Sequence, residues 1–240
     1  ETIPLYQRLF GDGNHLGLKI EYKVQNAPNG IAEAFIIGKD FMGNDSVTLI
    51  LGDNIFYGKL DFLREALNTN KGATIFGYYV NDPQRYGVVE FDDNGKVISL
   101  EEKPVQPKSN YAVVGLYVYN NDVIEISENL KPSKRGELEI TDVNIEYLKR
   151  NQLDIKVIGR GIAWLDTGTP QALIDVSSFI GAIEKRQGLK VACIEEVAYM
   201  MNYINLNQLK EIINKLPNSD YRNYLETVEQ NELIYKQYQA

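Results

Sequence analysis

Two aspartates follow short apolar runs, at positions where an α/β protein usually carries its chemistry. Asp53 comes after the run at 46–51, in the string LGDN, and Asp166 ends the run at 162–166 before the turn TGTP. Ligands of open α/β sheets bind beyond the carboxyl ends of the strands, and Mg²⁺ prefers oxygen ligands that it shares with phosphates. The two carboxylates could hold one divalent cation; the alternatives are a turn-forming role for Asp53 and an N-cap role for Asp166.

A second set of charged residues lies in the middle of the chain. Glu102 and Lys103 end a β-type run at a proline, and Arg135 opens the string RGELEITD. A carboxylate accepts hydrogen bonds from hydroxyl groups, Lys holds phosphate as a point charge, and Arg offers a bidentate fork. These side chains suit a ligand with hydroxyl and phosphate groups, although each one alone is better explained as part of a solvated charge cluster.

The string QNAPNGIAEA at 25–34 has the composition of a tight turn that opens a helix. Backbone N–H groups at such a turn suit a phosphate or a base edge, and Gly30 allows close approach of the ligand. Gln25 carries both a donor and an acceptor, which suits a pyrimidine edge. The local pattern by itself favours a plain strand-to-helix turn.

The composition excludes several other classes of function. The chain has 240 residues, a net charge of −8 and a pI near 4.9, which argues against a nucleic-acid partner. The single cysteine, Cys193, and the single histidine, His15, exclude an internal disulfide and a multi-histidine zinc site. No run of apolar residues is long enough to span a membrane, and no secretory leader is visible, so we expect a cytoplasmic protein.

The elements that must position these residues alternate between β-type and helical patterns. The β-type runs lie at 19–24, 46–51, 71–80, 87–103 (two runs joined by the hairpin signal DDNG), 110–120, 153–159 and 162–166. The helical patterns lie at 30–42, 60–70, 121–130, 138–150, 169–188 and through most of 195–240. This order predicts an α/β fold: a Rossmann-like, mixed and mostly parallel sheet with flanking helices, an antiparallel insertion and a helical C-terminal part. We expect a core at 1–190 and a helical extension at 191–240 packed on it.

A set of longer strings, in one order along the chain, carries a resemblance to a known family. The strings are YKVQNAPNGIAEAF, LILGDNIFYG, PQRYGVVEFD, LEEKP, YAVVGLYVY, RGELEITDVN and WLDTGT. With them the chain resembles the sugar-nucleotide pyrophosphorylases, and most closely their thymidylyltransferase branch. The resemblance implies the nucleotide-diphospho-sugar transferase fold, a homo-oligomer, and deoxysugar supply for cell-surface polysaccharide. It also implies Mg²⁺-assisted transfer of a thymidylyl group from dTTP to a sugar 1-phosphate such as glucose 1-phosphate, with release of pyrophosphate.

The resemblance also implies a role for each matching residue. Gln25 corresponds to the residue that reads the base, Gly30 packs against the nucleoside, and Asp53 and Asp166 hold Mg²⁺. The residues that correspond to those at the sugar phosphate are Tyr86, Gly87, Glu102, Lys103, Val113 and Arg135, with Trp164 near the same pocket. Asp53, Lys103 and Asp166 are the expected catalytic residues.

The sequence departs from the family pattern in two places. The family begins with a strand and a loop of the pattern GGxGTRL that wraps the triphosphate, and the printed sequence does not contain it. We therefore expect a longer natural protein, by roughly 50 residues, and little or no turnover by these 240 residues alone. Met200 stands where the family usually carries an arginine of a regulatory nucleotide site, at which Glu196 is a remaining contact, so regulation there is in question.

Three other interpretations remain open at this stage. A uridylyltransferase would differ in a few apolar contacts to the thymine methyl group and the sugar. A catalytically silent subunit that binds sugar nucleotides would account for the absent glycine-rich loop. A structural component of an oligomer would use the Tyr-rich helices after residue 195.

Overall fold

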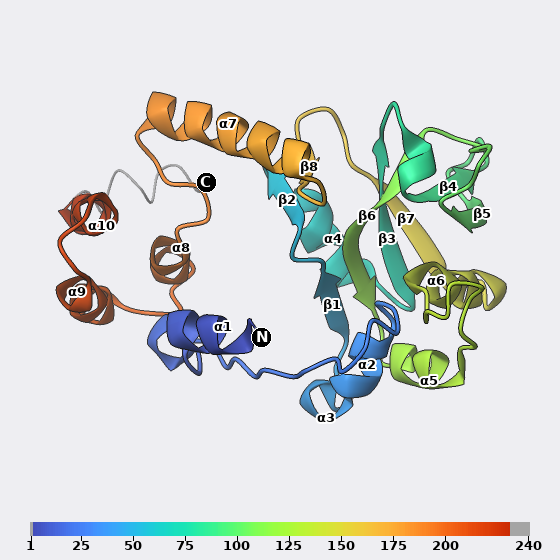
Figure 1. Ribbon diagram of the computed structural model, residues 1–240, viewed down its shortest axis with the longest axis horizontal. Helices are drawn as coiled ribbons and strands as arrows, with labels where there is room; N and C mark the ends of the chain where they lie inside the picture. The colour runs from blue at the N-terminus through green and yellow to red at the C-terminus, as the bar shows by residue number, and fades with distance from the viewer. Residues whose placement is uncertain (1, 231–240) are drawn as a thin grey trace. The chain divides into compact units, whose positions relative to one another are not determined.

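The computed structural model describes residues 2–230, which divide into two compact units (Figure 1). The first unit is Gln25–Val176, and the second combines the described residues before Gln25 with those after Val176. These limits differ from the expected division at residue 190. The packing of an extension on the core stays a prediction.

A six-stranded sheet forms the centre of the first unit, in the order β5-β4-β6-β3-β7, with β1 paired to β6. Its strands are β1 (Val47–Ile50), β3 (Ala73–Tyr79), β4 (Gly87–Phe91), β5 (Val97–Glu102), β6 (Tyr111–Tyr119) and β7 (Leu153–Val157). Within the described residues β3 and β7 form the parallel pair, and the other pairs of this sheet are antiparallel. The sheet is therefore less parallel than the alternation of elements predicted, because β6 runs against both β1 and β3.

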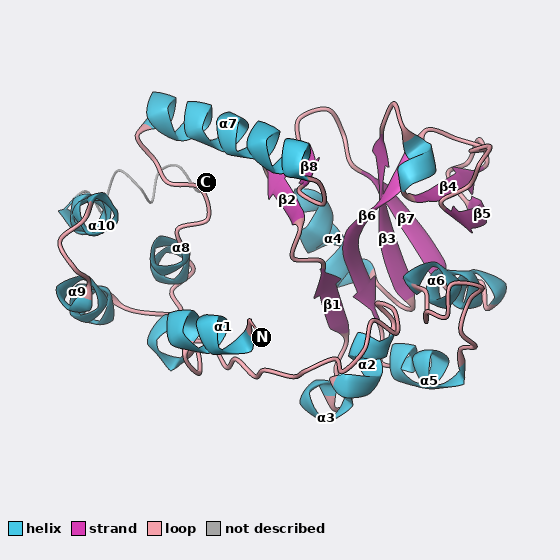
Figure 2. Ribbon diagram, in the orientation of Figure 1, coloured by secondary structure: helices cyan, strands magenta, loops and turns pink. Residues whose placement is uncertain are grey.

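Alternating side chains of the central strands build two hydrophobic layers. On one face Ile75 and Tyr119 pack with residues of the helices α2, α5 and α6, and on the other face Phe76 and Val118 pack with Ala66 of α4. This follows from the period of two along a strand, which sends neighbouring residues to opposite faces. The helices of this unit are α2 (Glu33–Ile37), α3 (Lys39–Met42), α4 (Asp61–Thr69), η2 (Pro83–Arg85), α5 (Asp122–Asn129) and α6 (Ile140–Lys149). Figure 2 shows helices on both sides of the sheet.

A second, two-stranded antiparallel sheet pairs β2 (Asn54–Tyr57) with β8 (Ala163–Asp166). Its register places Asn54 opposite Asp166 and Phe56 opposite Trp164. The helix α7 (Pro170–Gln187) starts four residues after β8 and continues into the second unit. The two segments that carry the sequence-predicted metal ligands are therefore neighbours in space.

The predicted α/β class is confirmed, and most helices and strands lie close to their predicted ranges. The strand β2 and the helix α1 were not predicted. Residues 19–24 are rich in β-forming residues, but the structure assigns them no strand, so this prediction was wrong. Strand propensity reflects packing against neighbouring strands rather than an intrinsic backbone preference. Among the described residues this segment has no such neighbour.

The second unit is helical and has its own core. It contains α1 (Ile3–Phe10), η1 (Asn14–Leu16), α8 (Ile194–Met200), α9 (Leu206–Lys215) and α10 (Asp220–Gln230). Met200 is buried in this core with Cys193. Glu196 accepts a hydrogen bond from the Tyr224 hydroxyl at 2.7 Å, and burial raises the pKa of this carboxyl group. None of the helices described for residues 2–230 is long and apolar enough to cross a membrane.

The core of the first unit contains a buried polar pair whose loss we expect to destabilise the fold. The Tyr119 hydroxyl donates to Asn144 Oδ1 at 2.6 Å, and both residues are almost fully buried. Tyr119→Phe removes this donor from a buried acceptor and should lower the free energy of unfolding by about 1–3 kcal/mol. Tyr79→Phe, at a tyrosine that is 60% exposed, is the control and should change it by less than about 0.5 kcal/mol. Urea unfolding followed by circular dichroism measures both values, and equal effects of the two substitutions would contradict this account of the core.

Candidate active site

A cavity of about 280 Å³ opens at the edge where the two sheets of the first unit meet. Its polar lining comes from the ends of strands, the turns beside them, strand β6 and the first turn of α6. The lining residues are Ile31, Leu51, Asp53, Asn54, Arg85, Tyr86, Gly87, Glu102, Lys103, Val113, Gly115, Tyr117, Ile140, Thr141, Trp164, Asp166, Gly168 and Thr169. Most of the sequence-predicted catalytic and sugar-phosphate residues therefore lie around one hollow.

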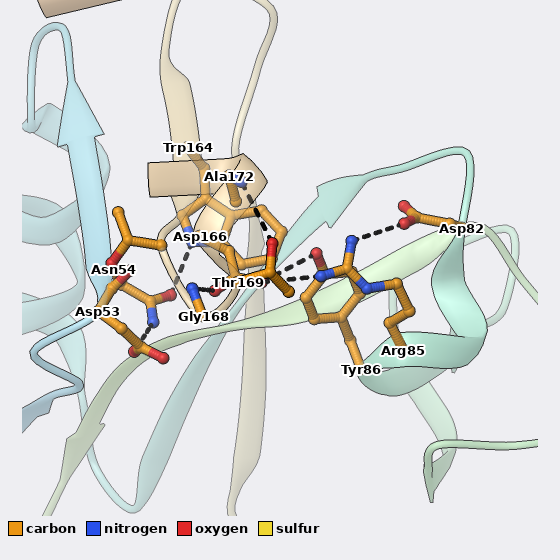
Figure 3. Close-up of polar contacts among 11 residues, drawn as sticks. Asp53, Asn54, Asp82, Arg85, Tyr86, Trp164, Asp166, Gly168, Thr169 and Ala172 are labelled. Atoms are coloured by element: carbon orange, nitrogen blue, oxygen red, sulfur yellow. Dashed lines mark hydrogen bonds and ion pairs between the residues drawn. The ribbon is translucent and has the colours of Figure 1, made fainter. Parts of the chain in front are cut away.

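The carboxylates of Asp53 and Asp166 converge on one side of this cavity (Figure 3). A Cβ atom placed on Gly168 would lie 2.9 Å from Asp166 Oδ1 and 3.7 Å from Asp53 Oδ2, so both oxygens surround the same small space. The Thr167 N–H donates to the Asp53 carbonyl at 2.8 Å, and the Gly168 N–H donates to Asp166 Oδ1 at 2.8 Å. The turn after β8 therefore fixes both aspartates against each other.

Arg85, the last residue of η2, and Tyr86, which follows it, also contact Asp166. Arg85 Nη2 lies 3.4 Å from Asp166 Oδ2, and the Tyr86 hydroxyl donates to the same oxygen at 3.3 Å. Arg85 also pairs with Asp82 at 2.9 Å, and its Cζ lies 5.3 Å from the centre of the Tyr86 ring. Arg85 was missed in the sequence analysis, although its place beside Tyr86 in PQRYG was a signal that could have found it.

Another part of the cavity lining carries the predicted sugar-binding carboxylate. Glu102, at the end of β5, accepts a hydrogen bond from the Thr141 hydroxyl at 2.6 Å, and its register partner is Gly87. A Cβ atom on Gly87 would lie 3.3 Å from both Glu102 Oε2 and Thr141 Oγ1, so the glycine leaves room beside this pair. Lys103 follows directly, with its Nζ 3.9 Å from Glu102 Oε1.

The sequence indicates Lys103 as a site residue but gives no local signal for Thr141. The Lys103 N–H donates to the Tyr86 carbonyl at 3.0 Å, and its backbone takes a positive φ of 43°, which turns the chain away from the strand. Lys103 was predicted from its type and position. Thr141 was missed, because its link to Glu102 depends on α6 packing against β5 and no local pattern marks it.

Three predicted residues lie outside the lining of the cavity. Gln25 donates to the Gly30 carbonyl at 2.9 Å and to Glu33 at 2.7 Å. Gly30 has a φ of 103°, and a Cβ atom there would lie 2.3 Å from the Leu138 carbonyl oxygen, so this turn requires glycine. Arg135 pairs with Glu137 at 3.1 Å and with Glu139 at 3.6 Å. Their predicted ligand contacts stay predictions.

The charges of the lining suit a divalent cation at the two aspartates. The lining contains three carboxylates (Asp53, Glu102 and Asp166) and two cationic side chains (Arg85 and Lys103). Two carboxylates that face one small space repel each other. A hard cation bound to their oxygen atoms, which are the ligands it prefers, relieves this repulsion. The described residues contain no group of three or more His, Cys, Asp or Glu side chains placed to hold a metal. Such a cation would therefore take its remaining ligands from water or substrate.

The fold is an α/β sheet whose cavity is lined by carboxylates and cationic side chains, and comparison with known proteins gives the family. Residues 1–182 match the model of the nucleotidyl transferase family, to which this chain belongs. It is 53% identical over 230 residues to the glucose-1-phosphate thymidylyltransferase of Mycobacterium tuberculosis, with 95% of this chain and 80% of that protein covered. The Xanthomonas campestris protein of the same name is 51% identical over 223 residues, which cover 92% of this chain and 76% of that protein.

Solved structures of similar fold are consistent with this family assignment. A crystal structure from Bacillus anthracis, assigned as a glucose-1-phosphate thymidylyltransferase and solved with sucrose, superposes with a TM-score of 0.68 at 40% identity. The match covers 74% of this chain and 71% of that one. A UDP-glucose pyrophosphorylase in complex with UDP-glucose gives a TM-score of 0.60 at 24% identity, over 70% of this chain and 66% of that one. At this lower identity the similarity concerns the fold alone.

The phenol of Tyr86 offers a test of the site by pH. Burial raises the pKa of Tyr86 to about 12, and the Asp166 carboxylate acts in the same direction while Arg85 opposes it. At pH 10.5 the Tyr86 hydroxyl should therefore still be protonated and donating to Asp166, whereas in the unfolded chain, with a pKa of about 10, it is largely ionised. The unfolded state has then lost more protons, so Tyr86 should lower stability as the pH rises above about 10.

The measurement compares the phenolate absorbance at 295 nm of the wild-type protein and Tyr86→Phe over this pH range. The two titrations should coincide up to about pH 11 and separate only above it. A loss of absorbance in the variant at pH 10 would contradict the burial of this hydroxyl.

Proposed function

We propose that this protein is a glucose-1-phosphate thymidylyltransferase, which forms dTDP-glucose and pyrophosphate from dTTP and glucose 1-phosphate. The observation that carries the proposal is the cavity in which two convergent aspartates face a Glu102–Thr141 pair and Lys103. The similarity to the Mycobacterium tuberculosis and Xanthomonas campestris enzymes supports the choice of substrates. The acidic pair would hold a cation that neutralises phosphate charge, and the hydrogen-bonded carboxylate would bind sugar hydroxyl groups. A reaction between a sugar phosphate and a nucleotide needs both features.

Nucleotidyl transferases of this family generally use a divalent metal. We assign Mg²⁺ to Asp53 and Asp166, where it would neutralise phosphate charge during the transfer. With a divalent cation present, the charged groups of the cavity would change from a net −1 to a net +1. An overall acidic chain could thereby attract anionic substrates at this place.

The residues around Glu102 would bind the sugar phosphate. Glu102, oriented by the Thr141 hydroxyl, accepts hydrogen bonds from sugar hydroxyl groups, and Gly87 leaves space beside it. Lys103 contacts the phosphate as a point charge. Tyr86, Val113 and Trp164 provide the apolar faces of the same pocket.

The nucleotide would occupy the side of the cavity next to the loop at 25–32. The Asn29 carbonyl accepts from the Leu138 N–H at 2.6 Å, so this loop lies beside the segment that leads into α6, and Ile31 lines the cavity. In this proposal Gln25 reads the thymine edge and Gly30 packs against the nucleoside. Arg135 would leave its partners Glu137 and Glu139 to contact phosphate, which is feasible because surface ion pairs contribute only about 0–1 kcal/mol.

The chemistry is an in-line displacement at phosphorus. A phosphate oxygen of glucose 1-phosphate attacks the α-phosphorus of dTTP, a new P–O bond forms, and the bond to the pyrophosphate leaving group breaks. The side chains described here contribute orientation and charge stabilisation, and no covalent bond to the protein forms. We further propose a cytoplasmic homo-oligomer in which residues 1–190 form the nucleotidyltransferase core and 191–240 a helical extension packed on it.

The activity is tested by incubating the natural gene product with glucose 1-phosphate, Mg²⁺ and either dTTP or UTP, followed by product analysis. We expect dTDP-glucose as the main product. Glu102→Gln should raise the KM for glucose 1-phosphate by about tenfold, because the amide accepts hydroxyl hydrogen bonds less strongly than the carboxylate. Glu101→Gln, at the exposed neighbouring residue of β5, is the matched control and should change KM by less than about twofold.

Binding measurements distinguish the ways in which this proposal could fail. The 240-residue chain should bind glucose 1-phosphate in calorimetry, and Glu102→Gln should weaken that binding. Preferential formation of UDP-glucose would replace the thymidylyl assignment. Binding without any turnover by the natural gene product would favour a silent sugar-nucleotide-binding subunit, and absence of both would refute the proposal.

A further inference from the structure

The side-chain amide of Asn54, the first residue of β2, joins three parts of the cavity wall. Its Oδ1 accepts from Trp164 Nε1 at 2.7 Å and from the Gly115 backbone N–H at 2.9 Å, and its Nδ2 donates to Asp53 Oδ1 at 2.7 Å. Two N–H donors can point only at the amide oxygen, so the orientation of the amide is fixed by its partners. Figure 3 shows Asn54 between Asp53 and Trp164.

The contact with Gly115 depends on the absence of a side chain on β6 at this position. A Cβ atom there would lie 2.6–2.8 Å from three atoms of the Asn54 amide, closer than ordinary contacts permit. The Gly115 carbonyl accepts from the Leu51 N–H at 2.9 Å, just beyond the last register pair of β1 and β6. Asn54 Oδ1 thereby supplies an acceptor for the Gly115 N–H at the point on β6 where β1 has ended.

The Trp164 ring is held at both ends. Its indole nitrogen donates to Asn54, and its ring contacts the Tyr86 ring edge-to-face with a centroid distance of 5.2 Å. Tyr86 in turn donates to Asp166 at 3.3 Å. A continuous series of contacts therefore runs from Asp53 through Asn54, Trp164 and Tyr86 to Asp166.

We propose that Asn54 is a positioning residue for the transfer reaction: it holds the Asp53 carboxylate in place for the cation and the Trp164 ring in place for the sugar. The proposal rests on the proposed function for its kinetic consequences, and on the three hydrogen bonds for its structural ones. Asn54 acts through Asp53 and Trp164, so it lowers the barrier indirectly. The two roles use different atoms of the amide and can be separated by substitution.

Two substitutions divide the roles of the amide. Asn54→Leu keeps a similar volume and removes all three hydrogen bonds. Asn54→Asp keeps an acceptor for Trp164 and Gly115, but it loses the donor to Asp53 and places a second negative charge beside that carboxylate. Asn218→Asp, at an exposed position of the turn before α10, introduces the same charge away from the cavity and is the control. Far-UV circular dichroism confirms that each variant folds.

The fluorescence of Trp164, the single tryptophan of the chain, reports on the first role without any turnover. Acrylamide quenching of this residue should increase about twofold or more in Asn54→Leu, since a buried ring loses its anchor. Asn54→Asp and Asn218→Asp should quench like the wild-type protein. Unchanged quenching in Asn54→Leu would overturn the anchoring of Trp164.

Kinetics of the natural gene product, with the same substitutions, report on the second role. Both Asn54 variants should lower kcat by about tenfold or more, because the Asp53 carboxylate is misplaced in both. The KM for glucose 1-phosphate should rise only in Asn54→Leu and stay within about twofold of wild type in Asn54→Asp. A purely structural role would move kcat and KM together in both variants.

The binding of Mn²⁺ to the 240-residue chain, followed by electron paramagnetic resonance, provides a readout without catalysis. Asn54→Leu should weaken this binding several-fold, whereas Asn218→Asp should leave it unchanged. Wild-type affinity and wild-type kcat in Asn54→Leu would overturn the positioning of Asp53. If no protein turns over while quenching and Mn²⁺ binding change as expected, the positioning role holds and the proposed function fails.

Discussion

The antiparallel pairing of β2 with β8 is the constraint on which the rest of the site depends. These segments are more than 100 residues apart in the chain, and their register sets Asn54 opposite Asp166. The backbone bond from the Thr167 N–H to the Asp53 carbonyl extends that pairing by one step. Two carboxylates are thereby held around one small space, which is where the proposed cation would bind.

The remainder of the fold brings a second kind of chemistry to this acidic pair. The β4–β5 hairpin places Gly87 beside Glu102, and the packing of α6 on β5 places the Thr141 hydroxyl on the Glu102 carboxylate. The two aspartates and the Glu102–Thr141 pair line the same cavity of about 280 Å³. In the proposed function the two aspartates hold the cation, and Glu102 and Lys103 bind the sugar phosphate.

The sequence predicted the elements well, and it predicted the site to the extent that single residues mark it. Apolar runs and turn signals located most strands, and the positions after them pointed to Asp53, Asp166, Glu102 and Lys103. The strand β2, which pairs with β8, was not predicted. The segment at 19–24 failed because its β-forming residues have no paired neighbour in the described chain. Thr141 and Asn54 were missed because their roles arise from hydrogen bonds across 39 and 110 residues, which no local pattern encodes.

The most direct test of this account is the position of a bound cation. Crystals of the protein grown with Mn²⁺ and glucose 1-phosphate would reveal the metal by its anomalous scattering. We expect one peak within about 2–2.5 Å of a carboxylate oxygen of both Asp53 and Asp166, with the sugar on the side of Glu102. A peak that contacts only one of the two aspartates, or a sugar phosphate bound away from Glu102, would contradict it.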